Sequence, residues 1–291
     1  MAADVLETIG RTPLLTLWGI SAKLETTNPT GSIKDRMAAY LVKRAEERGE
    51  LSPGQTILEV TSGNTGISLA MISAIRGYRF IAVMPESMST ERRKMMEVFG
   101  AEIILTPGEK DMAGAVEKYQ ELTDSHPGAW LPKQFESPDN IEAHEKGLGK
   151  EILEQTGGEI DAFAAGIGTG GTLIGVAKAL EGTGARIIGV EPAESAVLSG
   201  GKPGIHRIQG IGEGFIPKLV ADNMEYIDEV IAVKSQDAIA MSRRLAREHG
   251  VLAGTSSGAN MLAARSLKGY RNIVTVLPDR GERYFSAYGS R

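Results

Sequence analysis

The sequence of 291 residues contains no cysteine, which excludes disulfides, thiol nucleophiles and thiolate metal sites. Histidine is scarce, and the four imidazoles form no i, i+4 pair, so we expect no metal site. No apolar run reaches the roughly 18 residues of a membrane span. The first ten residues, MAADVLETIG, are too acidic for a secretory signal. A net charge of −5 does not indicate a nucleic-acid surface. We therefore expect a soluble, cytoplasmic protein with no nucleic-acid or membrane partner.

Short β-rich runs alternate along the chain with amphipathic helical stretches. The predicted strands are 56–60, 79–84, 102–105, 161–165, 186–191, 229–233 and 273–277. The predicted helices are 35–49, 64–76, 89–99, 112–124, 140–155, 171–181, 236–249 and 258–267. This alternation predicts an α/β protein with parallel-rich sheets that helices flank on both faces.

Two such series flank the segment 125–139, which contains two proline turns. We therefore predict two α/β lobes with the active site in the cleft between them. The smaller, mobile lobe is expected at 35–134. The larger lobe is expected to combine 1–34 with 135–291 and to carry the second of the glycine loops described next.

The first glycine loop, TSGNTG at 61–66, lies between a predicted strand and a predicted helix. Its backbone N–H groups would meet at a helix N-terminus and could bind a carboxylate or a phosphate. Thr61, Ser62, Asn64 and Thr65 add side-chain donors. A helix that is simply well capped explains the same residues.

The second glycine loop, GIGTGGT at 166–172, satisfies G-x-G-x-x-G through Gly166, Gly168 and Gly171. Glu191 follows twenty residues after Gly171, as in a dinucleotide site. The loop also suits a single phosphate, with the Thr169 and Thr172 hydroxyls assisting the amides. Glycines that serve only tight packing are a third explanation, and spacing does not separate the three.

The third loop, GTSSG at 254–258, matches the nucleophile elbow of hydrolases. That order requires a histidine after the serine, and the last histidine, His249, precedes Ser256. The elbow interpretation therefore fails, although Ser256 can still donate a hydrogen bond to a ligand.

Residues 28–36, NPTGSIKDR, contain turn residues that direct Lys34 rather than merely expose it. Three loops at strand ends indicate a small ligand with at least two anionic groups. A lysine amine that bonds covalently to an aldehyde completes a site for pyridoxal 5′-phosphate (PLP). Only the combination supports this function, because an isolated lysine is usually solvated.

These residues resemble the cysteine synthases (O-acetylserine sulfhydrylases), which are PLP enzymes of fold type II with a tryptophan synthase β-like fold. The resemblance covers nearly the whole chain. Its motifs occur in order at 8–14 (TIGRTPL), 23–36 (KLETTNPTGSIKDR), 57–70 (ILEVTSGNTGISLA), 166–175 (GIGTGGTLIG), 202–217 (KPGIHRIQGIGEGFIP), 253–258 (AGTSSG) and 281–284 (GERY). Residues 144–149, HEKGLG, lack the threonines that follow in the family, and the connection from Leu15 to Lys23 is shorter.

The resemblance implies a role for each matched residue. Lys34 would be the Schiff-base lysine, Asn64 would bind the ring hydroxyl, and Ser256 would meet the pyridine nitrogen. The phosphate would be held by Gly168, Thr169, Gly170, Gly171 and Thr172. The substrate carboxylate would be held by Thr61, Ser62, Thr65 and Gln134. Arg207 is either a phosphate ligand for O-phosphoserine or a solvated arginine.

The implied reaction is a β-replacement that makes L-cysteine from an O-activated L-serine, with O-acetylserine expected, and sulfide. It would pass through an α-aminoacrylate while Lys34 moves the Cα proton. The resemblance also implies a homodimer and a possible serine acetyltransferase partner.

Alternatives within the class are an O-phosphoserine sulfhydrylase, a cystathionine β-synthase and a serine or threonine dehydratase. Outside it are a nicotinamide-dependent oxidoreductase that uses Glu191 and a catalytically idle binding protein.

Overall fold

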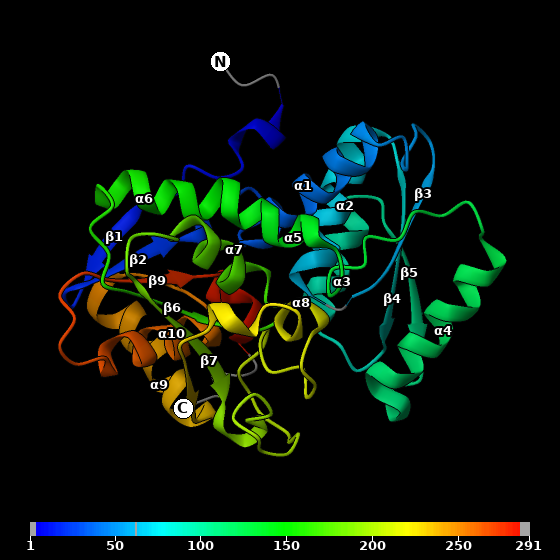
Figure 1. Ribbon diagram of the computed structural model, residues 1–291. Coiled ribbons are helices and arrows are strands. Elements are labelled where there is room, and N and C mark those ends of the chain that lie inside the picture. The colour runs from blue at the N-terminus through cyan, green and yellow to red at the C-terminus, as the bar shows by residue number, and fades with distance from the viewer. Residues whose placement is uncertain (1–3, 62, 286–291) are drawn as a thin grey trace. The chain divides into compact units, whose positions relative to one another are not determined.

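The computed structural model describes residues 4–61 and 63–285 (Figure 1). The chain divides into two compact units. The small unit comprises residues 1–7 and 34–133, and the large unit comprises residues 8–33 and 134–291. Within the described ranges, no helix combines the length and the apolar character that crossing a membrane requires.

The large unit is built on a six-stranded sheet of order β1-β2-β9-β6-β7-β8. Its strands are β1 (Leu14–Leu17), β2 (Ile20–Leu24), β6 (Ala162–Gly166), β7 (Arg186–Pro192), β8 (Glu229–Val233) and β9 (Ile273–Leu277). Only β1 runs antiparallel to its neighbour, and all other pairs are parallel. The predicted α/β class with parallel-rich sheets is therefore confirmed.

The hairpin of β1 and β2 was not among the predicted strands. Its two-residue turn is Trp18-Gly19, and both residues have positive φ, 49° and 80°. Such turns favour Asn-Gly or Asp-Gly, so a tryptophan at the first position gives no hairpin signal in the sequence.

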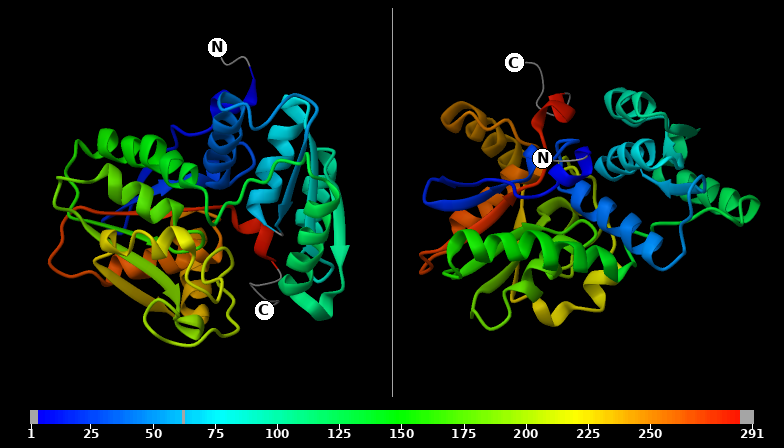
Figure 2. Two further views of the ribbon diagram at one scale, coloured as in Figure 1. Left: turned by 45° about the vertical axis from the view of Figure 1, so that its right-hand side comes forward. Right: turned by 90° about the horizontal axis from the view of Figure 1, so that it is seen from above.

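Helices cover both faces of the large sheet, as the right-hand view of Figure 2 shows with green helices on one side and orange helices on the other. The helices are α5 (Pro138–Ala143), α6 (Lys150–Thr156), α7 (Gly171–Ala179), α8 (Lys218–Ala221), α9 (Ser235–His249) and α10 (Thr255–Ser266). Side chains alternate along β6. Phe163 and Ala165 pack in one cluster with residues of α6 and α7, whereas Ala162 and Ala164 pack with residues of α9 and α10.

The small unit contains a three-stranded parallel sheet of order β3-β4-β5. Its elements are β3 (Thr56–Val60), β4 (Arg79–Pro85), β5 (Glu102–Thr106), α1 (Lys34–Glu47), α2 (Asn64–Arg76), α3 (Thr90–Val98) and α4 (Asp111–Ser125). Figure 1 shows α4 on one side of this sheet and α2 on the other. Leu58 and Val83 of the sheet pack in one cluster with Ala115 of α4.

Two predicted helices differ from the structure by more than two residues at one end or by an interruption, whereas the others agree within two residues. The predicted helix 140–155 consists of α5, a π-helical turn at His144–Gly149, and α6. Two glycines within those six residues weaken a regular α-helix at this point. The predicted helix 258–267 begins at Thr255, so Ser256 lies in its first turn rather than in the preceding loop.

A buried polar network joins β2 to α6. Lys23 is fully buried, and its Nζ lies 2.7 Å from Glu151 Oε2. The same Nζ donates to the Thr12 carbonyl at 2.6 Å and to Gln155 Oε1 at 2.8 Å. The second Glu151 oxygen accepts from the Arg11 N–H at 2.9 Å. Because every donor of this ammonium group has an acceptor, the network tolerates a buried charge.

We expect Lys23→Met to lower the free energy of unfolding by about 3 kcal/mol, because it leaves the partly buried Glu151 carboxylate without its cation. Urea denaturation at neutral pH measures the loss. The matched control is Lys43→Met, since Lys43 is exposed and lies 3.7 Å from Glu47. Equal stability losses in the two variants would contradict the role given to the buried network.

Candidate functional site

The carboxyl edge of the large sheet contains a topological switch point between β6 and β9. From β6 the chain continues to β7 and β8 on one side, whereas β9 borders β2 on the other. In open α/β sheets, ligands bind outside the carboxyl ends of the strands at such a point. The loop 166–172 follows β6, and the segment 278–281 follows β9.

The loop 166–172 has glycines where other side chains would collide with protein atoms. A Cβ at Gly168 would lie 2.5 Å from the Gly210 carbonyl oxygen, and one at Gly171 would lie 2.0 Å from Asn140 Oδ1. Gly170 has φ +90° and would meet Val220 at 2.3 Å. No described group accepts a hydrogen bond from the N–H of Gly168, Thr169 or Gly170. These amides precede the nine-residue helix α7 and form a site for an anion.

Asn140 is a fully buried residue that the sequence did not identify as part of the site. Its Nδ2 donates to Thr169 Oγ1 at 2.9 Å and to the Gln134 carbonyl at 2.8 Å. Its Oδ1 has no hydrogen-bond partner in the described chain. Asn140 therefore fixes two predicted site residues, Thr169 and Gln134, relative to each other. The only sequence signal is its place in SPDN, which is typical of a helix start.

Two further polar residues hold the glycine loop in place. His144 is buried, and its Nε2 lies 3.3 Å from Thr172 Oγ1. Asn260 of α10 accepts from the Gly166 N–H at 2.8 Å and donates to the Val276 carbonyl at 2.9 Å. Asn260 thereby connects the ends of β6 and β9.

Ser256 lies at the same edge of the large sheet, in the first turn of α10, and is buried. The neighbouring Thr255 hydroxyl accepts from the Gln209 N–H at 3.2 Å. The segment after Gln209 returns to the glycine loop, since the Gly212 N–H donates to the Ile167 carbonyl at 3.0 Å. The structure therefore brings together Ser256, the loop 166–172 and the segment 209–212.

Arg207 is exposed on the segment before Gln209. Its backbone N–H donates to Ser235 Oγ at 2.9 Å, and the Ser235 N–H donates to Glu194 Oε1 at 2.8 Å. Burial raises the pKa of the Glu194 carboxyl, but the hydrogen bonds from Ser235 outweigh it and keep that pKa below its ordinary value. The anchored backbone places Arg207 on a fixed part of this segment.

The NPTGSI peptide that precedes Lys34 pairs with the segment after β9. The Gly31 N–H donates to the Asn28 carbonyl at 2.7 Å, which forms a tight turn. The Ile33 N–H donates to the Pro278 carbonyl at 2.8 Å. Lys34 is the next residue, half-buried at the start of α1. The peptide leading to Lys34 is therefore held at the carboxyl end of β9.

The TSGNTG loop belongs to the small unit and opens α2. The Thr61 hydroxyl accepts from the Gly66 N–H at 3.2 Å and from the Gly63 N–H at 3.4 Å. Asn64 and Thr65 are the first two residues of α2, and Thr65 is buried. Ser62 lies outside the described residues. This arrangement sets Asn64 and Thr65 at the N-terminus of a 13-residue helix, where anions are favoured.

Glu191 does not serve the dinucleotide fingerprint that its spacing suggested. Its carboxylate is buried and accepts from the Leu198 N–H at 2.9 Å and from the Ser199 N–H at 3.0 Å. The Ser199 hydroxyl donates to it as well, at 2.6 Å. An acid used in this way is not available to a ribose hydroxyl, so the structure argues against a dinucleotide site.

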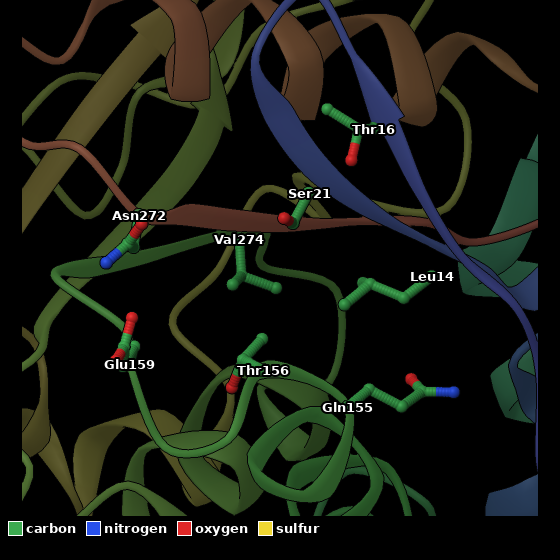
Figure 3. A pocket seen from close by; sticks show the side chains of 8 residues that line it. All are labelled: Leu14, Thr16, Ser21, Gln155, Thr156, Glu159, Asn272 and Val274. Carbon is green, nitrogen blue, oxygen red and sulfur yellow. The ribbon is translucent and has the colours of Figure 1, made fainter.

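A cavity of about 450 Å³ in the large unit lies at the opposite, amino edge of the sheet (Figure 3). Ser21 and Val274, which are paired near the starts of β2 and β9, both line it. It contains the Glu159 carboxylate and no cationic side chain. An anionic cofactor or substrate does not suit this cavity. In the described chain, no group of three or more His, Asp or Glu side chains could hold a metal ion.

Residues 5–279 match the family of pyridoxal-phosphate dependent enzymes, and the chain belongs to this family. Its cofactor is therefore PLP, whose phosphate fits the open amides of the loop 166–172.

Individual relatives and solved structures are similar to this chain over nearly its whole length. A cysteine synthase from Staphylococcus aureus is 48% identical over an alignment of 298 positions, which covers 97% of this chain and 95% of the relative. The crystal structure of a cysteine synthase from Entamoeba histolytica has a TM-score of 0.95 and 42% identity, covering 100% of this chain and 92% of that one. An O-acetylserine dependent cystathionine β-synthase from Helicobacter pylori has a TM-score of 0.91 and 38% identity, covering 98% of both chains.

We expect Asn140→Ala to weaken PLP binding about 5- to 10-fold, the effect of losing the hydrogen bond that orders Thr169. Titration of the apoprotein with PLP measures the dissociation constant. Asn272→Ala is the matched control, because Asn272 lines the cavity at the opposite edge. Unchanged PLP affinity in folded Asn140→Ala would show that Asn140 does not support the phosphate loop.

Proposed function

We propose that this protein is a cysteine synthase, which forms L-cysteine from O-acetylserine and sulfide with bound PLP. The observation that supports it most is the convergence of three open amides, Ser256 and the peptide before Lys34 on one edge of one sheet. The high identity to relatives named cysteine synthase supports the reaction, and the site geometry supports the residues that we assign to it.

Bound PLP supplies an aldehyde that links to amines and a ring that stabilises negative charge at the substrate Cα. In this proposal the loop 168–172 holds the phosphate, and Lys34 carries the aldehyde link. Asn64, at the start of α2, would donate to the ring hydroxyl. Ser256 would meet the pyridine nitrogen as a neutral group, which would hold a proton there less firmly than a carboxylate. This neutral partner would favour loss of the β-substituent over transamination.

Four residues are proposed to bind the substrate carboxylate: Thr61, Ser62, Thr65 and Gln134. Thr65 is buried in the first turn of α2, where the helix dipole favours an anion. Gln134 is buried, and its backbone carbonyl is held by Asn140. A fixed carboxylate orients the Cα–H bond of the substrate for proton removal.

Lys34 is proposed as the group that removes the Cα proton once the substrate has displaced it from the aldehyde. Acetate then leaves Cβ with the electrons of the C–O bond, sulfide adds at Cβ, and Lys34 returns the proton to Cα. A single amine can do both, because it is released as a base and remains beside the carbon that it deprotonated.

Absorption spectroscopy tests this function directly. Purified protein with PLP is expected to show a visible band that shifts to longer wavelength with O-acetylserine and returns when sulfide is added. Lys34→Ala is expected to lose turnover by at least about 10³-fold, since it removes both the covalent link and the general base. Lys43→Ala, an exposed lysine of the same helix, is the control.

A protein that gains no visible band when PLP is supplied would contradict the proposal. A response to O-phosphoserine alone would favour the second candidate, an O-phosphoserine sulfhydrylase, and Arg207→Ala should then abolish that response. Exposed Arg207 on its anchored segment is the observation that favours this candidate. A homodimer and a serine acetyltransferase partner stay proposals that rest on the family resemblance alone, and a cytoplasmic location stays a proposal that rests on the composition of the sequence.

A further inference from the structure

Residues 278–284, which we call the C-terminal clasp, lie between two loops that the proposed function uses. On one side the clasp pairs with the peptide before Lys34, through an antiparallel bridge between Ser32 and Asp279. On the other side it pairs with the peptide before Ser256, through a bridge between Ala253 and Arg280. The clasp therefore sets the spacing between these two peptides.

Backbone hydrogen bonds on both sides hold the clasp. The Arg280 N–H donates to the Gly31 carbonyl at 3.2 Å. The Gly254 N–H donates to the Asp279 carbonyl at 3.0 Å, and the Gly281 N–H donates to the Leu252 carbonyl at 3.1 Å. These bonds form a small antiparallel patch at the carboxyl end of β9.

Two arginine side chains of the clasp extend along the peptide before Lys34. Arg280 Nε donates to the Thr26 carbonyl at 2.9 Å, and Arg283 Nη2 donates to the Thr30 carbonyl. Arg280 is partly exposed, whereas Arg283 is 93% buried, since only 7% of its surface is accessible. A buried guanidinium group that donates to a carbonyl restrains that peptide strongly. The donor is planar, charged and packed on its sides, so a displaced carbonyl would lose the hydrogen bond.

Gly31 provides the space for both side chains. Its φ is +84°, and a Cβ there would lie 2.8 Å from Arg280 Cδ and 3.0 Å from Arg283 Nη2. The glycine of NPTGS is thus explained by the arginines as well as by the turn. Thr30 lies four residues before Lys34, nearer than Thr26 at eight.

We propose that Arg283 is a positioning residue for Lys34. It acts through the Thr30 carbonyl, fixing the peptide from which Lys34 starts α1, and touches neither substrate nor cofactor in this role. The inference rests on the proposed function, in which Lys34 bonds to PLP. Misplacement of a reacting group by about 1 Å can slow a reaction by up to about 10²-fold, so a loosened peptide should slow the reaction of this lysine.

The test measures the chemistry of Lys34 without turnover. Apoprotein is mixed with PLP, the mixture is quenched with borohydride at timed intervals, and peptide mass mapping gives the fraction of Lys34 that carries the reduced adduct. We expect Arg283→Met, which keeps most of the stem volume, to slow labelling of Lys34 about 10-fold. Arg283→Lys should recover part of the rate, because it restores a cationic donor.

The matched control is Arg186→Met, since Arg186 is an exposed arginine of the large unit that pairs with Asp228 at 3.6 Å. In Arg186→Met, Lys34 should be labelled by PLP at the same rate as in the parent protein. Thermal unfolding of each apoprotein is measured alongside. If Arg283→Met does not fold, Arg283→Gln is used instead, because its shorter side chain cannot reach the Thr30 carbonyl.

Labelling of Lys34 at the parent rate in a folded Arg283→Met or Arg283→Gln protein would overturn the inference. Equal slowing in Arg283→Met and Arg186→Met would overturn it as well. If the parent protein itself gives no adduct at Lys34, the proposed function fails rather than the role of Arg283, so the two failures are distinguishable.

Discussion

The parallel pairing of β6 with β9 is the constraint on which the site of the large unit depends. From β6 the chain continues to β7 on one side, whereas β9 borders β2 on the other side and is the last strand, so no helix connects the loops that follow β6 and β9. Asn260 ties the two strand ends together with two hydrogen bonds. The glycine loop, Ser256 and the peptide before Lys34 all take their places from this pair. A shift of β9 against β6 would therefore displace every one of them.

The glycine loop shows how packing and binding can demand the same residue. The glycines of the loop 166–172 approach Gly210, Val220 and Asn140 too closely for a Cβ. The sequence left three explanations open: a dinucleotide site, a phosphate cradle and tight packing. The structure supports packing on one side of the loop and open amides on the other. The dinucleotide explanation weakens because Glu191 binds its own chain at residues 198 and 199.

The sequence predicted the fold class and most strands because buried parallel strands are continuous apolar runs. It did not predict the hairpin at Leu14–Leu24, whose Trp18-Gly19 turn has no usual turn signal. The glycine loops and Lys34 were recognisable because turn residues punctuate the chain around them. Asn140 was not recognisable, and of the C-terminal clasp only the motif GERY (281–284) was, since the roles of both arise from contacts between segments far apart in sequence. The helix α10 likewise starts at Thr255 rather than at 258, and Thr255 makes a contact with Gln209 that no local pattern indicates.

The division of the chain between the two units has a consequence for synthesis on the ribosome. The main part of the small unit, residues 34–133, is continuous, so that its sheet is complete once those residues have emerged. In the large unit β2 pairs with β9, so Ser21 cannot form its pair until Val274 has been synthesised. At a synthesis rate of about 5–20 residues per second, this delay lasts roughly 10–50 s. During that time the edge of β2 lacks its final partner, and the amine of Lys23, later fully buried, lacks two of its acceptors until Glu151 and Gln155 have emerged. The nascent large unit is therefore the part of the protein that most needs protection from aggregation.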